Sequence, residues 1–422
     1  MFFNLLVFNN ERLREQSLEG ACAQLNSDNG ISMKKQSLHE RFNEKALAFL
    51  KAALEHVLEK NKSLDLQQVG KYKSFKRILI KDSVCFQIDE SYADEYPGSG
   101  GSGSKASIRI QFEYDLISGK INDLSIHPFI EQDATNSTET LNLTQQGDLV
   151  MRDLAYINLN VLSELSNKGA FFLCRPKTNI TIREKTNDGT QKFNFKEIRH
   201  YMNKNNITTL EKCVYIGLDK MLPVRLILHL LPDSEVEKRR RKRKKILKKK
   251  GRREPEDNKS GQSREYNERM FFNLFITNTE IDEVPTQHVW PLYRLRWQIE
   301  LVFKIWKSIC HIDKLKKVKK HRFQCYLYGR LIFIMLGWRI IQSVALTLFA
   351  REKKTISNFK AFKALFSNNL QEMKDALILR KMPIQNFIVR FYNTASRYLI
   401  LEKRSRYNDQ NTITLNCEIS ML

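Results

Sequence analysis

Five residues between positions 293 and 307 have types and spacing that could bind phosphate groups and a metal ion. On a helix of about 100° per residue, Tyr293, Arg296, Glu300, Lys304 and Lys307 fall within roughly 80° of one another. One carboxylate would then stand among three cations and a phenol. Two interpretations are open: a solvated helix face with spaced Glu and Lys, which is common, or part of a site for charged substrate groups.

The opposite side of the same stretch is apolar. Leu295, Ile299, Val302, Trp306 and Ile309 cluster there, which predicts a helix that docks this arc against a core. The charged stripe must therefore face something other than the core.

Two aspartates follow apolar runs earlier in the chain. The β-branched run KRILI leads into Asp82, which predicts this carboxylate at the end of a strand. The short run DLVMR leads into Asp153, and a helix from about Asn158 to Lys168 follows, closed by Gly169. Each Asp alone could equally be a turn former.

The spacing of the four residue types resembles a known signature. The pattern resembles the Tyr-Arg-Glu-Lys signature of DDE transposases encoded by bacterial insertion sequences. It consists of Tyr293, Arg296, Glu300 and Lys307, which are separated by two, three and six residues. That group has a ribonuclease H-like catalytic domain. The resemblance implies that Glu300 is a metal-binding carboxylate. It also implies that Tyr293, Arg296 and Lys307 contact the phosphates of DNA at the element's ends.

Asp82 and Asp153 match the two aspartates that this family carries on preceding strands. Asp153 is followed by Leu154, Ala155 and Tyr156, where the family commonly has Gly before the Tyr. Asp82 is followed by Ser-Val, where the family usually has Ser-Thr. Both departures keep the carboxylates.

The function implied by the resemblance is cut-and-paste transposition. DNA is cleaved at the ends of an insertion sequence, and the freed 3′-hydroxyl attacks target DNA. Asp82, Asp153 and Glu300 would hold two metal ions, one polarising water and the other stabilising the leaving oxygen. Oxygen ligands favour Mg²⁺, with Mn²⁺ as a substitute. The alternatives are a catalytically decayed DNA-binding protein or regulator, and a general nuclease.

Composition supports a polyanionic partner. The chain has 422 residues and a net charge of +24, which favours nucleic acid over a membrane surface. The seven Cys and eight His are scattered without zinc or redox spacing, so we expect reduced thiols and carboxylate-bound metal. The N-terminus lacks a basic leader and a cleavage site, which predicts a cytoplasmic protein. The family resemblance adds association with the bacterial nucleoid.

Residues 238–253 form the densest charge run, KRRRKRKKILKKKGRR, in which thirteen of sixteen residues are basic. This run accounts for over half of the net charge. It is either a solvated mobile segment or a surface that contacts DNA phosphates without sequence preference.

The N-terminal segment has the outline of a helix-turn-helix. Ser17 starts one amphipathic helix, residues 27–30 break it, and Ser32 is a candidate cap of a second helix. An ordinary helical hairpin is the alternative. If the unit binds DNA, base edges would meet residues near the start of the second helix, which are Lys34, Lys35, Gln36 and His39.

An aromatic residue just upstream of the Glu300 helix is a candidate stacking surface. Related transposases that form a DNA hairpin commonly place a Trp before a short strand and Thr-Asn, and this chain has Phe272 followed by NLFITN. A flipped base could stack on Phe272. Alternatively Phe272 points into the core, because Phe271 occupies the opposite face of the strand and one of the two must point inward.

The predicted fold class is α/β, with a ribonuclease H-like mixed sheet, an inserted β-rich subdomain and helical terminal segments. Strands are expected at 106–114, 121–126 and 170–175, in NITIRE, KCVYIGL and LPVRLILHLL, and at 270–278. The apolar stretch 327–349 is interrupted by charges, which predicts a buried core helix rather than a membrane span.

The C-terminal helices either pack on their own domain or pair two subunits as a homodimer in the synaptic complex. The expected domains are a helical DNA-binding segment (1–70), the catalytic domain in two parts (71–180 and 270–350), a β-rich insertion with the basic run (181–269) and a C-terminal helical segment (351–422).

Overall fold

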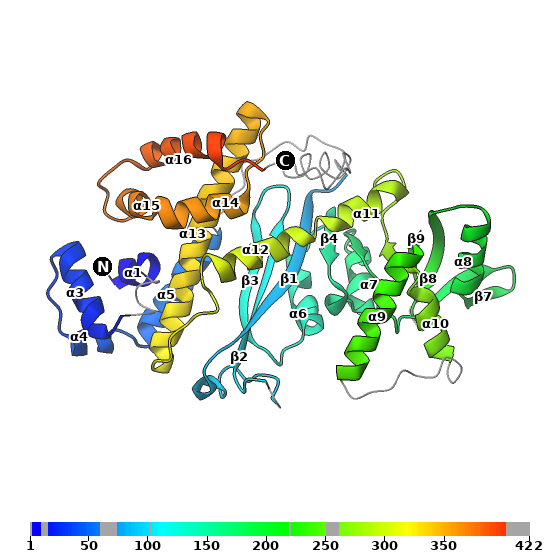
Figure 1. Ribbon diagram of the computed structural model, residues 1–422, viewed down its shortest axis with the longest axis horizontal. Helices are drawn as coiled ribbons and strands as arrows, with labels where there is room; N and C mark the ends of the chain where they lie inside the picture. The colour runs from blue at the N-terminus through cyan, green and yellow to red at the C-terminus, as the bar shows by residue number, and fades with distance from the viewer. Residues whose placement is uncertain are drawn as a thin grey trace. The chain divides into compact units, whose positions relative to one another are not determined.

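The structure, a computed structural model, describes residues 2–9, 16–59, 74–100, 103–218, 221–249 and 261–401. The chain divides into two units (Figure 1). Unit 1 comprises Met1–Lys71, Lys81–Gln132 and Trp297–Leu422, and unit 2 comprises Tyr72–Ile80 and Asp133–Arg296.

The sheet of unit 1 has the strand order β3-β2-β1. Strand β1 (Arg77–Gln87) starts in unit 2 and continues into unit 1. Strands β2 (Ser107–Asp115) and β3 (Ile121–Pro128) form an antiparallel hairpin in which Ile110 lies opposite Ile126. The predicted hairpin is therefore confirmed.

The predicted end of the first strand is wrong. Strand β1 does not stop near Asp82 but continues to Gln87, with Val84 and Phe86 buried in alternation. The polar residues around Asp82 are compatible with a strand because Lys81, which is fully buried, forms an ion pair with Asp123 on β3 at 2.7 Å.

Helices cover the apolar face of this hairpin. The Phe112 ring on β2 lies 5.0 Å from the ring of Trp306 and 6.0 Å from the ring of Trp338, centre to centre. The helices of unit 1 are α1 (Phe2–Phe8), α3 (Leu18–Asn29), α4 (Lys35–Glu40), α5 (Glu44–Glu59), the 3-10 helix η1 (Glu90–Tyr92), α12 (Trp297–Ser308), α13 (Lys320–Glu352), α14 (Asn358–Lys363), the π-helix η4 (Ala364–Asn368), α15 (Leu370–Leu377) and α16 (Ile384–Tyr398).

Helix α13 contains the long apolar stretch. It is long and apolar enough to cross a membrane by length and composition, but 61% of its most apolar window is buried in the fold. The Trp338 indole donates a hydrogen bond to the carbonyl of Gly119 at 3.0 Å. The prediction of a buried core helix is confirmed, and one mostly buried helix is weak evidence for a membrane span.

The sheet of unit 2 has the order β1-β4-β5-β10-β9-β8-β6-β7. Strands β4 and β5 are parallel, whereas β10 runs antiparallel to both β5 and β9. The strands predicted from sequence in this unit are present, and β7 is an addition. Their bounds are β4 (Asp148–Arg152), β5 (Phe171–Cys174), β6 (Ile182–Thr186), β7 (Gly189–Lys192), β8 (Thr209–Ile216), β9 (Leu222–Leu230) and β10 (Phe272–Thr277).

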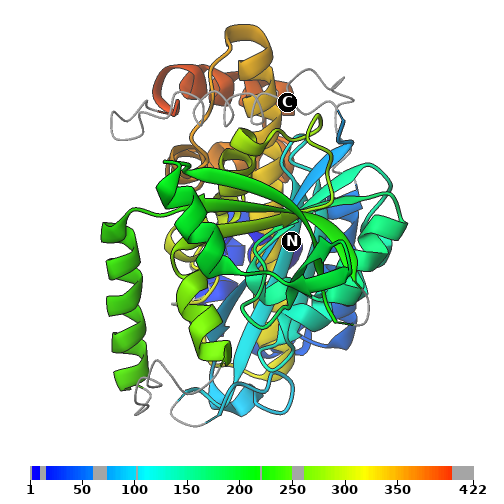
Figure 2. The same ribbon diagram turned by 90° about the vertical axis from the view of Figure 1, so that its right-hand side faces the viewer.

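The helices of unit 2 flank these strands. Helix α7 begins after Asn158, whose side chain accepts from the Asn160 amide, and Gly169 follows with φ of +68°, as predicted. Figure 2 shows α9 and α10 as neighbouring helices. The helices are α6 (Asp133–Glu139), the 3-10 helices η2 (Thr140–Leu143) and η3 (Leu154–Tyr156), α7 (Leu159–Asn167), α8 (Phe195–Lys204), α9 (Asp233–Lys249), α10 (Gly261–Arg269) and α11 (Thr286–Arg294). The predicted class, a mixed α/β fold with strands flanked by helices, is confirmed and is consistent with a ribonuclease H-like transposase domain.

The N-terminal helices have the predicted helix, turn, helix outline. The Ser17 hydroxyl accepts from the Gly20 amide at the start of α3, and Gly30 ends this helix with φ of +65°. Helix α4 starts later than expected, because its N-cap residue is Lys34 and not Ser32.

Candidate active site

The signature residues lie on two helices rather than one. Helix α11 ends at Arg294 and α12 begins at Trp297. Between them, the amide of Arg296 donates to the carbonyl of Tyr293 at 3.1 Å in a tight turn. The predicted continuous stripe is therefore wrong, and the solvated-face interpretation fails for Tyr293 and Arg296, which are 6% and 7% exposed.

The apolar arc of the stretch is buried as predicted. Leu295, Ile299, Val302 and Trp306 are each at most 2% exposed. Packing of this arc fixes the rotation of α12 about its own axis, so that Glu300 and Lys307 are half-buried and Lys304 is exposed.

In unit 1, Asp82 lies within strand β1. Its Oδ1 accepts a hydrogen bond from the Ser83 amide at 2.8 Å. Side chains on either side of Asp82 anchor the strand to its neighbours: Lys81 pairs with Asp123, and the Ser83 hydroxyl accepts from Arg109 at 3.0 Å. Asp82 therefore stands on a strand segment that is fixed on both sides.

Also in unit 1, helix α12 is attached to this strand. Glu300 lies in the first turn of α12 and Lys307 in the last turn. The Lys307 ammonium donates to the carbonyl of Cys85 on β1 at 3.1 Å. The helix that carries Glu300 is thereby bonded to the strand that carries Asp82.

In unit 2, Asp153 directly follows strand β4, as predicted. The preceding Arg152 is 4% exposed and donates to the hydroxyl of Ser137 at 2.7 Å. The carbonyl of Ile157 accepts from the Lys177 ammonium at 2.8 Å. Bonds before and after Asp153 therefore hold this turn in place.

Tyr293 and Arg296 belong to unit 2, with Asp153. The Arg296 guanidinium carbon lies 5.9 Å from the centre of the Tyr293 ring. Burial raises the pKa of Tyr293, and the charges of Arg296, Asp153 and Arg175 act on it as smaller contributions. Within the part of the chain that the structure describes, the buried Tyr293 hydroxyl has no hydrogen-bond partner. This hydroxyl remains protonated and able to donate to a ligand.

The chemistry of the carboxylates suits a hard divalent cation, which prefers oxygen ligands. Asp82, Asp153 and Glu300 offer carboxylate oxygens alone. Among the described residues, no three His, Cys, Asp or Glu side chains are grouped closely enough to hold a metal ion.

The N-terminal candidates lie on the surface of α4. Lys34, Lys35 and Gln36 are exposed. Lys35 forms an ion pair with Glu19 on α3 at 2.6 Å, and the Gln36 amide donates to Glu40 at 2.9 Å. Their role in DNA contact stays a prediction.

The stacking role predicted for Phe272 does not fit this structure. A base can stack only on an accessible ring, and Phe272 is 1% exposed, with its ring 6.1 Å from that of Phe195 in the core. The alternative, an inward Phe272, is therefore correct. Phe271 lies on the other face of the chain and lines a groove.

Two arginines that were not predicted from the sequence lie in unit 2, as Asp153 and Tyr293 do. Arg175 directly follows β5, as Asp153 follows β4. The argument that placed Asp153 at the end of a strand could therefore have identified Arg175 as well. Arg225 on β9 donates to Glu211, to Thr279 and to the backbone of the loop that precedes α11. It holds the helix of Tyr293 in place, and no local pattern in the sequence marks it.

Comparison with known proteins gives a family match over most of the chain. A family model described as "Transposase DDE domain" matches residues 73–336. The matched range includes Asp82, Asp153 and Glu300.

Several relatives are similar to this chain over most of their length. The transposase for insertion sequence element IS231E of Bacillus thuringiensis subsp. finitimus is 30% identical over 416 residues, which cover 95% of this chain and 84% of the relative. The transposase for IS231F of Bacillus thuringiensis subsp. israelensis is 32% identical, covering 90% and 80%. The transposase for IS1151 of Clostridium perfringens is 30% identical, covering 78% and 70%.

Proposed function

Because this chain belongs to the DDE transposase family and is a DNA transposase, we propose that Asp82, Asp153 and Glu300 are its catalytic carboxylates. The observation that carries the proposal is the hydrogen bond between Lys307 and Cys85. Glu300 lies seven residues before Lys307, about 10 Å along a helix. Asp82 lies three residues before Cys85, about 10 Å along a strand.

The directions of the two elements support this argument. In Figure 1, α12 and β1 both run from upper right to lower left. Starting from the bond between Lys307 and Cys85, equal steps back along both elements lead to Glu300 and Asp82. Two carboxylates brought together in this way would supply ligands that metal-dependent cleavage of phosphodiesters requires.

Transposases of this family use divalent metal ions, and Mg²⁺, with Mn²⁺ as a substitute, is the ion that we propose here. Asp82, Asp153 and Glu300 would hold it. When bound, it would polarise water and stabilise the leaving oxygen.

The remaining signature residues would bind the DNA backbone. The Tyr293 hydroxyl is a protonated donor, and Arg296 next to it carries a permanent charge that suits phosphate. Together they can orient a phosphate beside Asp153 and neutralise its charge in the transition state. Lys307, two turns after Glu300 on α12, contributes positive charge and keeps α12 attached to β1.

The substrate of a transposase is DNA. The protein would cleave double-stranded DNA at the ends of its insertion sequence and join the ends to target DNA. It would work as a homodimer in the synaptic complex. It would act in the cytoplasm, at the bacterial nucleoid.

Single-carboxylate variants test this function. Asp82→Asn, Asp153→Asn and Glu300→Gln should each abolish Mg²⁺-dependent cleavage of DNA with the element's ends, while DNA binding without metal is retained. Asp188→Asn, which changes an exposed residue in the turn between β6 and β7, is the matched control and should cleave normally. Cleavage at wild-type rate by one of the three variants would remove that residue from the site. A wild-type protein that binds the ends but cleaves with neither Mg²⁺ nor Mn²⁺ would contradict catalysis altogether.

A further inference from the structure

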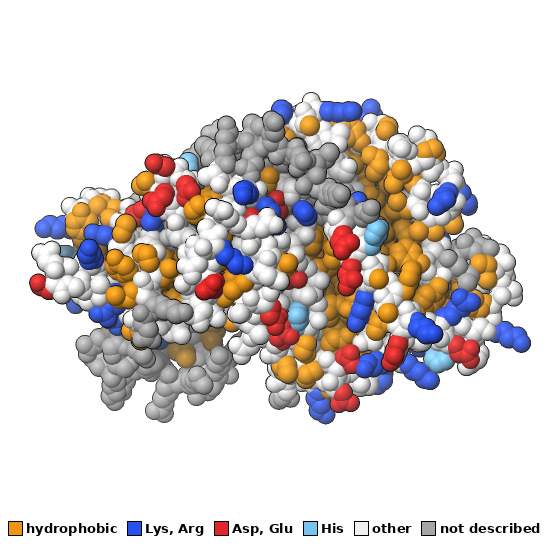
Figure 3. Space-filling view, turned by 180° about the vertical axis from the view of Figure 1, so that it is seen from behind, with side chains coloured by type: hydrophobic (Ala, Val, Ile, Leu, Met, Phe, Trp, Pro, Cys, Tyr) orange, Lys and Arg blue, Asp and Glu red, His pale blue; other side chains and the backbone are white. Residues whose placement is uncertain are grey.

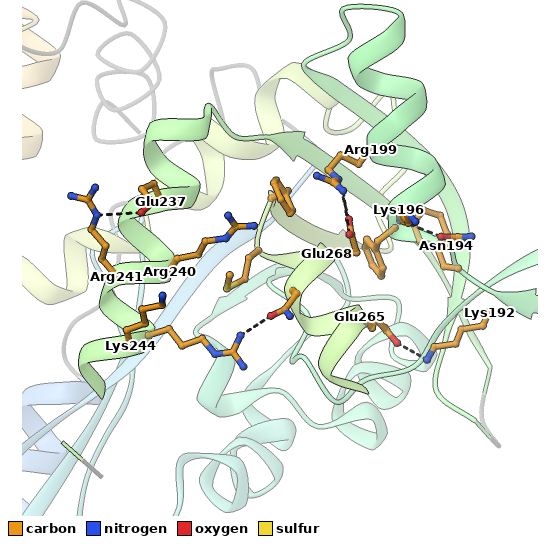
Figure 4. A pocket seen from close by; sticks show the side chains of 16 residues that line it. Lys192, Asn194, Lys196, Arg199, Glu237, Arg240, Arg241, Lys244, Glu265 and Glu268 are labelled. Atoms are coloured by element: carbon orange, nitrogen blue, oxygen red, sulfur yellow. Dashed lines mark hydrogen bonds and ion pairs between the residues drawn. The ribbon is translucent and has the colours of Figure 1, made fainter. Parts of the chain in front are cut away.

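A groove of about 1230 Å³ lies in unit 2 between α9 on one side and α8 and α10 on the other. Figure 4 shows Arg240, Arg241 and Lys244 of α9 along one wall, and Lys196 and Arg199 of α8 across from them. None of these residues belongs to the proposed catalytic set. The groove is therefore a candidate binding site that the catalytic proposal does not use.

Cations outnumber carboxylates in the groove. Seven Lys or Arg and three Glu side chains line it. Each Glu already has an ion-pair partner: Glu237 pairs with Arg241, Glu265 with Lys192 and Glu268 with Arg199. The lining thus keeps a surplus of four positive charges. On the face of the molecule drawn in Figure 3, by contrast, Lys and Arg are scattered among acidic and uncharged side chains.

An aromatic ring lies among these cations. The Phe271 ring is half-buried, with the guanidinium carbon of Arg199 4.0 Å and that of Arg240 5.3 Å from its centre. The ring and the planar guanidinium groups over it together form a flat cationic surface on which a base can stack, and the surrounding cations can bind the phosphates of the same strand.

The walls of the groove are fixed to the sheet. Arg239, whose pKa burial lowers, donates from α9 to the carbonyls of Met270 and Phe272 at 3.2 and 2.9 Å. Arg269 of α10 donates to the carbonyl of Ile180 at 2.8 Å. The first turns of α9 are thus anchored, and the groove exists before any ligand binds. Preorganisation of this kind lowers the cost of binding.

We propose that this groove binds an unpaired strand of DNA, a partner that rests on the transposase function proposed above. Duplex DNA presents its phosphates but keeps its bases stacked inside, so an aromatic ring in the groove adds nothing for it. An unpaired strand presents both. Its phosphates would lie against Arg240, Lys244 and Lys196, and a base would stack on Phe271.

The test compares two probes in buffer with EDTA, so that no cleavage occurs. The probes are a fluorescein-labelled oligothymidine of about 15 nucleotides and a duplex of the same length. Arg240→Ala/Lys244→Ala removes two groove cations. Lys242→Ala/Lys245→Ala removes the same charge from the same helix, at positions outside the groove lining, and is the matched control. Arg239 stays unchanged in both because it anchors α9.

The groove variant should bind the oligothymidine about tenfold or more weakly. In a plot of the logarithm of the affinity against the logarithm of the salt concentration, the slope should become shallower by about 1.4. Each lost phosphate contact to a single strand changes this slope by about 0.7. The control pair should change both quantities far less. Equal losses in the two variants would overturn the groove as the binding site and leave only unspecific attraction by α9.

A substitution of the ring tests the choice of an unpaired strand. Phe271→Leu keeps an apolar side chain but removes the flat surface, and circular dichroism checks its fold. It should weaken oligothymidine binding about fivefold or more and leave duplex binding within twofold. Equal effects on the two probes, or none on the oligothymidine, would overturn the proposal. Asp82→Asn should bind the oligothymidine as the wild type does, so failure of the groove and failure of catalysis are separable.

Discussion

The ammonium of Lys307 donates a hydrogen bond to the backbone carbonyl of Cys85 across 3.1 Å. These residues are 222 positions apart in the sequence, yet they join the last turn of α12 to the strand of Asp82. The lysine of the signature therefore has a structural contact, in addition to the phosphate contact that the family resemblance implies.

Replacing Lys307 should lower both the free energy of unfolding and the rate of DNA cleavage. Lys307→Met keeps the aliphatic stem and removes the donor, so we expect a loss of about 1.5 to 3 kcal/mol in the free energy of unfolding, as for hydrogen bonds to charged groups. Cleavage should fall further than this loss explains, because Glu300 is no longer fixed. Urea denaturation and a cleavage assay measure the two effects. Lys304→Met, on the exposed face of α12 one turn earlier, should unfold like the wild type; an equal loss there would refute the role of the bond.

Tyr293→Phe should separate stability from activity. The wild-type hydroxyl is buried without a partner among the described residues, so its removal should leave the free energy of unfolding unchanged or raise it by about 1 kcal/mol. Cleavage should nevertheless fall about tenfold or more if the hydroxyl binds a phosphate. Because burial raises the pKa of Tyr293, the loss should be the same from pH 6 to about 9. Full activity in the variant would mean that the hydroxyl touches no substrate.

Replacing Phe272 should cost far more stability than replacing Phe271. Phe272→Ala opens a cavity in a core where the ring is 1% exposed, and we expect a loss of about 3 to 5 kcal/mol in the free energy of unfolding. Phe271→Leu changes a half-buried ring at the groove and should cost less than about 1.5 kcal/mol. Thermal unfolding of both proteins, compared with the wild type, decides this. A Phe272→Ala protein as stable as the wild type would contradict the burial of the ring.

The elements that could be predicted from sequence are those specified by neighbouring residues. Asp153 was placed correctly at a strand end because β4 is short and bounded by turn formers, and Asn158 and Gly169 mark the ends of α7. Asp82 was placed wrongly because the partner that permits Lys81 inside a strand, Asp123, is 42 residues away.

Long-range packing also explains the other errors. The periodicity from Tyr293 onward fits one helix, but the turn at Leu295 and Arg296 separates two helices. For the aromatic pair, alternation required one of Phe271 and Phe272 to point inward, but only the core around Phe195 decides which. The three candidate carboxylates were proposed from their order and the family resemblance, whereas Arg225 and the groove at Phe271 depend on contacts that no local pattern encodes.

The ion pair between Glu211 and Arg225 should make stability depend on pH. Burial opposes ionisation of Glu211, but hydrogen bonds from Arg225 and Thr286 outweigh it and lower its pKa. A lowered folded-state pKa stabilises the protein above the unfolded pKa of about 4.3, and this stability is lost as the pH falls through the folded value. Glu211→Gln should therefore cost about 1 to 3 kcal/mol at pH 7 and less at about pH 3.5. Urea midpoints of both proteins at the two pH values test this, and a pH-independent difference would exclude the charge as its cause.

The ion pair between Lys35 and Glu19 should limit DNA binding by the N-terminal helices. The hydrogen bond between them lowers the pKa of Glu19 and raises that of Lys35, so both stay charged at neutral pH. If Lys35 contacts DNA, its ammonium must leave Glu19. Glu19→Gln should thus raise the affinity for duplexes that carry the terminal repeats of the proposed insertion sequence about two- to fivefold, without changing thermal stability.

The control for this effect is Glu55→Gln, which removes the same charge from the exposed side of α5. Lys35→Ala and Gln36→Ala should narrow the difference in affinity between the repeats and random DNA, because base contacts carry specificity and phosphate contacts do not. Fluorescence anisotropy with both duplexes measures all four variants. If Glu19→Gln and Glu55→Gln raise affinity equally, net charge explains the gain and Lys35 is not held back by Glu19. If Lys35→Ala and Gln36→Ala keep the full difference between the repeats and random DNA, helix α4 does not read the sequence.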